Sequence, residues 1–359
     1  MIRHDANQGF RTWCTTRALF LGLFLPCVSQ AQTCATPNVH LDTQAEINTF
    51  QADHGPCTQL TGDLMIGGIS GPSDIDSLGP LAGLSHVGGD LVISETFSLL
   101  SLAGLESLSF VGGDMTLFHN FALLEIDALA ALERVDGDFT IFANPVQRSI
   151  DGLSNLHSTG GMMGVTDLHD IRDIDALASL VSVGSHLLIS FNPLLEDLAG
   201  LASVSEVGGS VMIRLNDQLE SLAGLDALVH VGLALDVRDN ASLVSLTGLE
   251  AVEHVGANLR IQNNPALTHC RALTRILDAV DHGTPGPGAA PSPDLGGAAY
   301  IDGNAPGCRD RYEALGIAAP PSPVPTLALP GLLLCSLAVL AAGLARTRVS
   351  ERSRPPTRP

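Results

Sequence analysis

Apolar and polar positions recur with a regular period of about 24 residues along most of the chain. An earlier unit begins at Leu60 and is slightly longer because of an insertion near Gly71, so the repeats span residues 60–267. A period of this length predicts a stacked repeat fold in which each unit is one coil. The repeats begin at Val87, Val111, Val135, Thr159, Val183, Val207, Val231 and Val255, and the first two read Val-Gly-Gly-Asp.

The first third of each repeat is predicted to be a short strand. Counting from the leading residue, positions 5 and 7 are apolar in every unit, as in Leu91 and Ile93. Alternation with a period of two indicates a strand with one buried face. We expect positions 4 to 8 to pair in parallel from coil to coil. Position 2 is Gly in seven of the eight units, and Asp136 takes it in the other. We interpret the recurrent Gly as a corner that requires positive φ.

An Asn follows the predicted strand at position 10 in six of the eight units. An Asn side chain at a turn can bond to backbone groups, and stacked coils would align these amides as a ladder. Thr96 and Leu168 take this position in the other two units. The predicted ladder residues are Asn120, Asn144, Asn192, Asn216, Asn240 and Asn264.

The second half of each repeat is apolar at every third position, as in Leu99, Leu102 and Leu105. This spacing is close to that of a helix, but position 18 is always small, as in Gly104. Because Gly disfavours a long helix, we expect a tight turn with a short 3₁₀ piece.

These residues resemble a known family. The stretch TQAEINTFQADHGPCTQLTGDLMI, then GGDLVIS and LAGLESL, is similar to the receptor L-domain modules, relatives of the leucine-rich repeats. The resemblance covers residues 40–270, and the spacing VxxxLxIxxN favours the L-domain side over LxxLxLxxN. It implies a mainly β protein, a right-handed parallel β-solenoid of about nine coils. Members of this family are mostly recognition or scaffold proteins, so the resemblance brings no catalytic residues.

The chain begins with a predicted signal peptide, residues 1–31. Three Arg residues precede the apolar run ALFLGLFLPC, and Ser29-Gln30-Ala31 has the small-x-small pattern of a cleavage site. A lipid-modified Cys27 is the minor alternative. Export is expected to place the protein at a bacterial cell envelope or surface.

Four cysteines remain outside the terminal apolar segments, and none lies within the repeats. End coils expose an apolar face and require caps. We therefore predict disulfides Cys34–Cys57, in an N-terminal cap of residues 32–59, and Cys270–Cys308, in a C-terminal cap of residues 268–310. The other pairings would join opposite ends of a long rod. Asp42 or Thr43 should begin a helix in the first cap, with Glu46 completing a capping box, and residues 271–279 should form a second short helix.

The C-terminal part is predicted to be a Pro-rich linker (311–323), a membrane-spanning or sorting segment (324–345) and a basic cytoplasmic tail (346–359). It resembles the IPTL-type signals that exosortase-like membrane proteases process. The motif consists of Val324, Pro325, Thr326, Leu327 and Gly331, with Pro330 where that group has an aromatic residue. The resemblance implies a sorting protease as a partner and release after cleavage; the alternative is a plain single-pass anchor.

The net charge of the chain argues against binding to nucleic acid. The chain carries −20, and without the leader (three Arg against one Asp) and the tail (five Arg against one Glu) the remainder carries −26. It contains no Lys. A body so acidic disfavours binding to nucleic acid.

Positions 6 and 8 of the strand should face outward and offer a binding surface. Phe118 and Phe142 occupy position 8 of adjacent coils, with Phe191 at position 9 of a later one. Exposed aromatic rings in a row can bind a sugar ring or an apolar partner, or they can simply cover the sheet. Arg214 and Arg238 lie further along the same column, and they can bind a ligand or pair with neighbouring acidic residues.

No catalytic set stands out. A glycosidase needs two carboxylates about 5–10 Å apart, and no Asp pair recurs on the strand face. We therefore expect a protein that is not an enzyme and has no cofactor or metal, and that recognises a glycan, polymer or protein through its strand face. A passive structural component of the envelope and a polysaccharide-active β-helix enzyme are the alternatives.

Overall fold

The computed structural model describes residues 32–34, 38–68, 73–278 and 295–316. The predicted signal peptide, the sorting motif Val324–Gly331, the membrane segment and the basic tail lie outside these ranges. Within the described ranges, no helix is long and apolar enough to cross a membrane.

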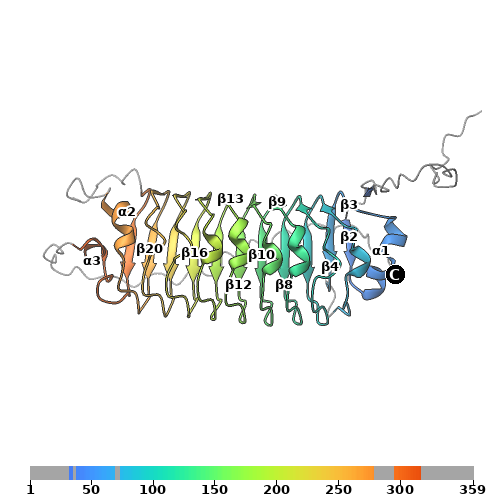
Figure 1. The fold of residues 1–359 in the computed structure, drawn as a ribbon, viewed down its shortest axis with the longest axis horizontal. Coiled ribbons are helices and arrows are strands. Elements are labelled where there is room, and N and C mark those ends of the chain that lie inside the picture. Colours follow the sequence, from blue (N-terminus) through green and yellow to red (C-terminus); the bar gives the residue numbers. More distant parts are fainter. Residues whose placement is uncertain (1–31, 35–37, 69–72, 279–294, 317–359) are drawn as a thin grey trace, which may run out of the picture. The chain divides into compact units, whose positions relative to one another are not determined.

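The described residues are mainly β and form two parallel sheets (Figure 1). In each sheet the strands follow one another in sequence order, and partners in adjacent repeats occupy the same repeat position, as Leu187 and Val211 do. This is the arrangement of a β-solenoid, one coil per repeat.

The larger sheet, which we call sheet B, contains the predicted strands. Its members are β2 (Asn38–Leu41), β4 (Asp63–Ile66), β6 (Leu91–Ser94), β8 (Met115–Phe118), β10 (Phe139–Phe142), β12 (Met163–Thr166), β14 (Leu187–Ser190), β16 (Val211–Arg214), β18 (Leu235–Arg238), β20 (Leu259–Gln262) and β21 (Ala299–Asp302).

Sheet A was not predicted. It consists of two-residue strands at the boundary between repeats: β1 (Thr33–Cys34), β3 (Gln59–Leu60), β5 (His86–Val87), β7 (Phe110–Val111), β9 (Arg134–Val135), β11 (Ser158–Thr159), β13 (Ser182–Val183), β15 (Glu206–Val207), β17 (His230–Val231) and β19 (His254–Val255).

The third side of each coil is made of turns and short 3₁₀ helices, as the small residue at position 18 predicts. These helices are η1 (Gly79–Leu81), η2 (Asp127–Ala131), η3 (Asp151–Leu153), η4 (Asp175–Ser179), η5 (Ala199–Leu201) and η6 (Arg271–Leu273). Side chains from all three sides, such as Leu91, Leu102 and Val111, are fully buried and form one continuous core.

The glycines at position 2 serve a different purpose from the one predicted. Gly184 does not have a positive φ. A Cβ added to Gly184 would lie 2.0 Å from the carbonyl oxygen of Gly160 in the preceding coil. The sequence interpretation of a positive-φ corner was therefore wrong, because the constraint is the close approach of one coil to the next.

The Asp of Val-Gly-Gly-Asp forms a second ladder, at position 4. The Oδ1 atom of Asp90 accepts a hydrogen bond from the backbone N–H of Asp114 at 2.8 Å, and Asp114 accepts one from Asp138 at 2.9 Å. A Cβ on Gly113 would lie 2.1 Å from that same Oδ1 of Asp90. Where the tetrapeptide occurs, its second Gly and its Asp therefore both make contacts between neighbouring coils.

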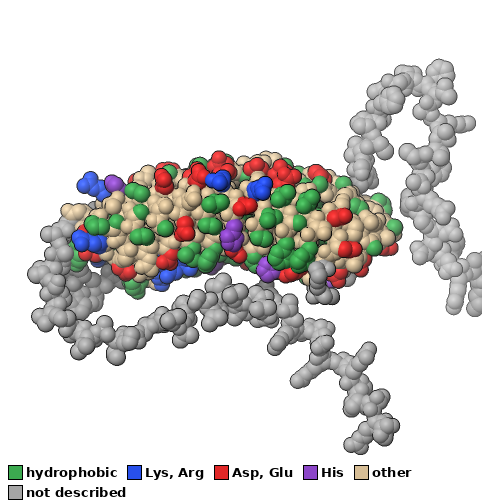
Figure 2. Space-filling view, turned by 90° about the horizontal axis from the view of Figure 1, so that it is seen from below, with side chains coloured by type: hydrophobic (Ala, Val, Ile, Leu, Met, Phe, Trp, Pro, Cys, Tyr) green, Lys and Arg blue, Asp and Glu red, His purple; other side chains and the backbone are tan. Residues whose placement is uncertain are grey.

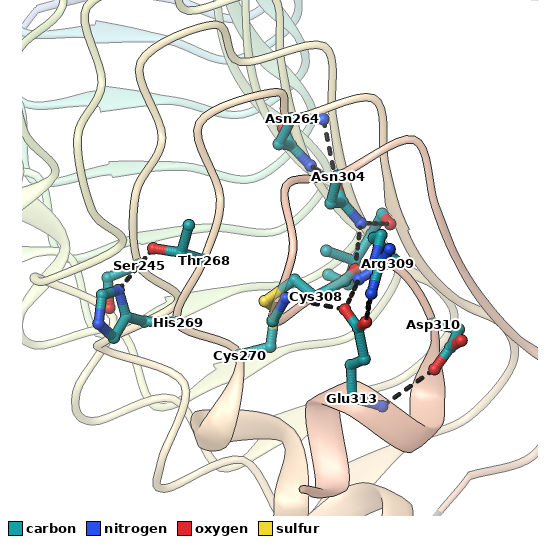
Figure 3. The surroundings of a disulfide bond; sticks show 12 residues. Ser245, Asn264, Thr268, His269, Cys270, Asn304, Cys308, Arg309, Asp310 and Glu313 are labelled. Atoms are coloured by element: carbon teal, nitrogen blue, oxygen red, sulfur yellow. Dashed lines mark hydrogen bonds and ion pairs between the residues drawn. A yellow bond between two sulfur atoms is a disulfide. The ribbon is translucent and has the colours of Figure 1, made fainter. Parts of the chain in front are cut away.

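The Asn ladder runs through the buried turn at position 10. Asn216 donates through Nδ2 to the carbonyl of Ile189 at 3.0 Å, and its Oδ1 accepts from the backbone N–H of Asn192 at 3.2 Å. Asn304 continues the ladder in the last coil, where its Oδ1 accepts from the backbone N–H of Asn264 at 3.0 Å (Figure 3). Because a buried amide must be hydrogen-bonded, the ladder holds each coil in register with its neighbours.

Both ends of the repeat region carry extra strands and helices. At the first end, α1 (Gln44–His54) begins at Thr43, whose side chain and that of Glu46 form the predicted capping box, and Cys34 is bonded to Cys57. Hydrogen bonds from the backbone of Asp42 and Thr43 lower the pKa of Glu46, and they outweigh the opposing effect of burial.

At the other end, β21 pairs with β20 and adds a further coil. Cys270 is bonded to Cys308 beside α2 (Thr274–Asp278) (Figure 3). Residues 311–315, predicted as the start of the linker, instead form α3 (Arg311–Leu315). The Asp310 side chain accepts from two backbone N–H groups and begins this helix.

Candidate functional site

The outward side of sheet B presents straight columns of side chains. In-register pairing places position 8 of each coil beside position 8 of the next, as it places Phe118 beside Phe142. Neighbouring strands of a sheet lie about 4.8 Å apart, so side chains in one column can touch. A feature of the sequence that recurs in successive repeats therefore becomes a continuous strip of surface.

Phe118 and Phe142 form a stacked aromatic pair on β8 and β10. Their ring centroids are 5.1 Å apart and the ring planes differ by 5°. Both side chains are only partly buried. His119 lies next to the pair, 5.2 Å from the Phe118 ring, and its Nδ1 is 2.7 Å from a carboxylate oxygen of Glu95.

Two further phenylalanines extend this aromatic surface beyond the strand. Phe97 and Phe121, at position 11 of adjacent coils, stack with centroids 4.7 Å apart and are 46% and 41% exposed. The His119 ring lies 5.9 Å from Phe121 and so joins the two pairs. We call these five residues the aromatic patch: Phe97, Phe118, His119, Phe121 and Phe142.

A left-handed residue at position 9 shapes the edge of the patch. His119 has a φ of 53°, and the residue at position 9 has a positive φ in all eight repeats, from Glu95 to Asn263. Such a conformation is unfavourable for a residue with a Cβ, and it persists where surrounding bonds over-determine it. At His119 the buried Asn120 that follows provides such bonds, to the Ile93 carbonyl and to the Asn144 side chain, and the His119 side chain points outward.

Phe191 does not join the patch. It also occupies position 9 with a φ of 58° and is 53% exposed, but it lies two coils beyond Phe142. Among the aromatic residues that the structure describes, none makes a ring contact with it.

The arginines on the strand face surround one buried carboxylate. Asp236 on β18 is 1% exposed, and its oxygens accept hydrogen bonds from Arg214 Nη2 at 2.5 Å and Arg238 Nε at 2.6 Å. A nitrogen of Arg260 lies 3.9 Å from the same carboxylate. The sequence left open that these arginines pair with acidic neighbours. They do so only in part, since three guanidinium groups share the one carboxylate of Asp236.

The aromatic patch and the arginine cluster are separate. Three strand steps, from β10 to β16, separate Phe142 from Arg214, or roughly 14 Å at the usual strand spacing. Both nevertheless lie on sheet B, so a long ligand parallel to the axis can contact both.

Sequence reasoning missed Phe97, Phe121 and His119. The available signal was the recurrence of Phe at position 11 in two successive repeats, but position 11 follows the predicted strand and its direction depends on the turn. Tyr300 was missed because the segment that carries it pairs with β20 across a sequence separation longer than the repeat period, so the repeat pattern does not mark it.

The surfaces outside sheet B show fewer features that could bind a ligand. A hollow of about 380 Å³ is lined by Arg148, Asp170, Arg172, Asp173 and Leu194, and its two arginines already pair with acidic side chains. Near this hollow, partial loss of solvent and the negative charges of Asp173 and Asp197 raise the pKa of Asp175. In the described ranges, no group of three or more His, Cys, Asp or Glu side chains could hold a metal ion.

Acidic side chains dominate the rest of the surface. On the side shown in Figure 2, red side chains are spread along the length of the described body and blue ones are few, while hydrophobic side chains gather over the coils near β8. Comparison of the chain with protein-family models, with curated proteins and with solved structures finds no match.

Proposed function

We propose that this chain is an exported binding protein, not an enzyme, and that it recognises a glycan, an extracellular polymer or a protein through sheet B. The aromatic patch is the observation that carries this proposal. Four phenylalanines and a histidine contact one another across three consecutive coils, and two of the rings are more than two-fifths exposed. An apolar ring exposed to water without a partner is unfavourable, and stacked rings match the apolar faces of sugars.

The exposure of Phe97 and Phe121 argues against the passive alternative. A ladder whose only role is to stabilise the sheet would bury its rings against the neighbouring coils, as the half-buried Phe118 and Phe142 do in part. Phe97 and Phe121 project from the turn and cover little of the core. Removing them should therefore affect a ligand more than stability.

The proposal also includes export and retention at the bacterial cell envelope by the C-terminal segment. The two disulfides favour an oxidising compartment. The intact mass and cell fraction of the mature protein test this part. A mass ending near Val324 outside the inner membrane supports sorting, whereas a mass ending at Pro359 in the inner membrane supports a plain anchor.

The aromatic patch is tested by Phe97→Ala combined with Phe121→Ala. Binding to a panel of neutral β-linked hexasaccharides and to the extracellular polymer of the source cells is measured by calorimetry. We expect at least about a tenfold loss of affinity, because burying a Phe side chain completely contributes about 1.5–3 kcal/mol. Phe191→Ala, an equally exposed ring outside the patch, is the matched control and should bind as the wild type does.

Unchanged binding by the double variant, with the control also unchanged, would remove the aromatic patch from consideration. Turnover of any polysaccharide by the purified protein would instead support the enzyme alternative. A protein that binds no polymer and no protein, but whose loss weakens the envelope, would support the passive one.

A further inference from the structure

The arginine cluster on β16, β18 and β20 carries an excess of positive charge in an acidic protein. Arg214, Arg238 and Arg260 surround the single carboxylate of Asp236. None of the three has a nitrogen within 4.0 Å of a second carboxylate among the described residues. With all four groups ionised, the cluster has a charge of +2.

Among the described residues, Asp236 alone is shared by more than one arginine. Elsewhere in the described ranges, each arginine that forms an ion pair does so with one carboxylate of its own. These pairs are Arg134–Asp136, Arg148–Asp170, Arg172–Glu196, Arg275–Glu253 and Arg309–Glu313.

The carboxylate of Asp236 holds the guanidinium groups in place. It accepts from Arg214 and Arg238 on different strands, and its own side chain is 1% exposed. The three arginine side chains remain 30%, 31% and 33% exposed, so their outer nitrogens reach solvent. Like charges held this close repel one another, and an anion placed between them would relieve the repulsion.

Hydrogen bonding in the cluster is also incomplete. The Nε atom of Arg214 is buried and has no hydrogen-bond partner in the described part of the chain. Arg238 uses Nε for Asp236, which leaves both of its terminal nitrogens for another acceptor. A guanidinium group presents its donors as a planar fork that matches a carboxylate or a sulfate.

We infer that Arg214, Arg238 and Arg260 bind the anionic groups, carboxylate or sulfate, of an acidic polysaccharide. This inference rests on the proposed function, because it names the class of glycan that sheet B would recognise. Tyr300 on β21 supports a sugar as the carrier of the anion. Its side chain is 44% exposed, and the Arg260 guanidinium lies over the ring, 5.7 Å from the ring centroid, so a cation and an aromatic ring meet at the surface.

A peptide ligand is less suited to this site. The strands β16, β18 and β20 are paired on both edges, so an acidic peptide cannot add to the sheet through its backbone. Contacts must come from side chains alone, and these are arranged in columns along the axis of the repeats. A linear polymer with charges at regular spacing fits such a surface.

The test compares three hexasaccharide probes by calorimetry at two salt concentrations: oligogalacturonate, its carboxyl-reduced neutral form, and a sulfated oligosaccharide. We expect the wild type to bind at least one charged probe about tenfold more tightly than the neutral form, with affinity falling as salt rises. The chosen variant is Arg260→Gln, because Arg260 is the most distant of the three from Asp236. Arg172→Gln removes the same charge elsewhere and is the matched control.

Arg260→Gln should weaken the charged probe about fivefold or more and leave the neutral probe unchanged, while Arg172→Gln changes neither. Preference for oligogalacturonate over the sulfated probe identifies carboxylate as the group, and the reverse identifies sulfate. Equal affinity for charged and neutral probes, no binding of either charged probe, or equal effects of the two variants would overturn the inference.

Failure of the anionic site can be distinguished from failure of the proposed glycan or protein recognition. If Phe97→Ala with Phe121→Ala abolishes glycan binding while Arg260→Gln has no effect, recognition by sheet B stands and the anionic site does not. Melting temperatures of all variants show whether a loss reflects unfolding.

Discussion

Gln147 accepts a hydrogen bond from the buried side-chain amide of Asn144, with Oε1 and Nδ2 3.1 Å apart. In three later coils, those of Asn216, Asn240 and Asn264, the amide of the ladder Asn also reaches the Asn of the next coil, as Asn240 reaches Asn264 at 3.2 Å. The next coil after Asn144 has Leu168 at this position, which cannot accept. Gln147 stands where most other repeats have Leu, is fully buried, and supplies the missing acceptor.

Gln147→Leu should therefore destabilise the protein by about 1–3 kcal/mol, because it leaves one N–H of the buried Asn144 amide without a partner while the other still donates to the Leu117 carbonyl at 3.2 Å. Adding Leu168→Asn to that variant would continue the ladder and recover most of the loss. Guanidinium unfolding followed by circular dichroism measures both. If the loss in the double variant equals the sum of the two single losses, Gln147 does not compensate for Leu168.

Gly184→Ala should destabilise the protein by at least ~2 kcal/mol, since overpacking at a rigid site forces the backbone to move. The added Cβ would lie 2.0 Å from a carbonyl oxygen of the preceding coil. Gly83→Ala is the control, because its nearest atoms would be 3.9 and 4.0 Å away. Thermal unfolding of the two variants should differ clearly; similar midpoints would show that coils can separate at this corner.

Cys270→Ser combined with Cys308→Ser should loosen the last coil. The disulfide closes a loop with a sequence separation of 38, and chain entropy assigns such a loop about 4 kcal/mol. We expect the amides of β21 to exchange hydrogen much faster, while those of β12, in the middle of the sheet, change little. Equal acceleration in both strands would mean that the bond stabilises the whole body and does not act as a local cap.

Acid should loosen the same end of the protein. Hydrogen bonds from the Arg309 side chain, and from the backbone of Arg309 and Gly307, lower the pKa of Glu313 from 4.5 to about 2. Since the folded pKa is depressed, the stabilisation is fully present above about pH 4.5 and is lost as the pH falls toward 2. The protection factors of the α3 amides, which correct for the intrinsic pH dependence of hydrogen exchange, should fall across this window.

Glu313→Gln removes the titrating group, so the protection factors of the α3 amides should be lower at neutral pH and nearly independent of pH between 4.5 and 2. Glu253→Gln is a suitable control, because Glu253 also pairs with an arginine but lies outside the cap helix. A wild-type protein whose α3 protection factors are unchanged at pH 2 would contradict the role of Glu313.

The sequence by itself determined the repeat, the buried positions of each strand, the in-register parallel pairing and the location of the ladder. All of these follow from periodicity, because a pattern with a constant period stacks onto itself whatever the detailed path of each coil. The capping box at Thr43 followed in the same way from local residue types.

Only the tertiary structure showed which contacts neighbouring coils make with one another. The glycine at position 2 reflects a backbone approach to the preceding coil, and Asp114 binds a backbone amide of the following repeat. Neither contact exists within a single repeat. The aromatic patch required the left-handed turn at His119, and the site at Asp236 required the added strand that brings Tyr300 to Arg260. Contacts between coils depend on how far apart two backbones stand, and one-dimensional periodicity does not specify that distance.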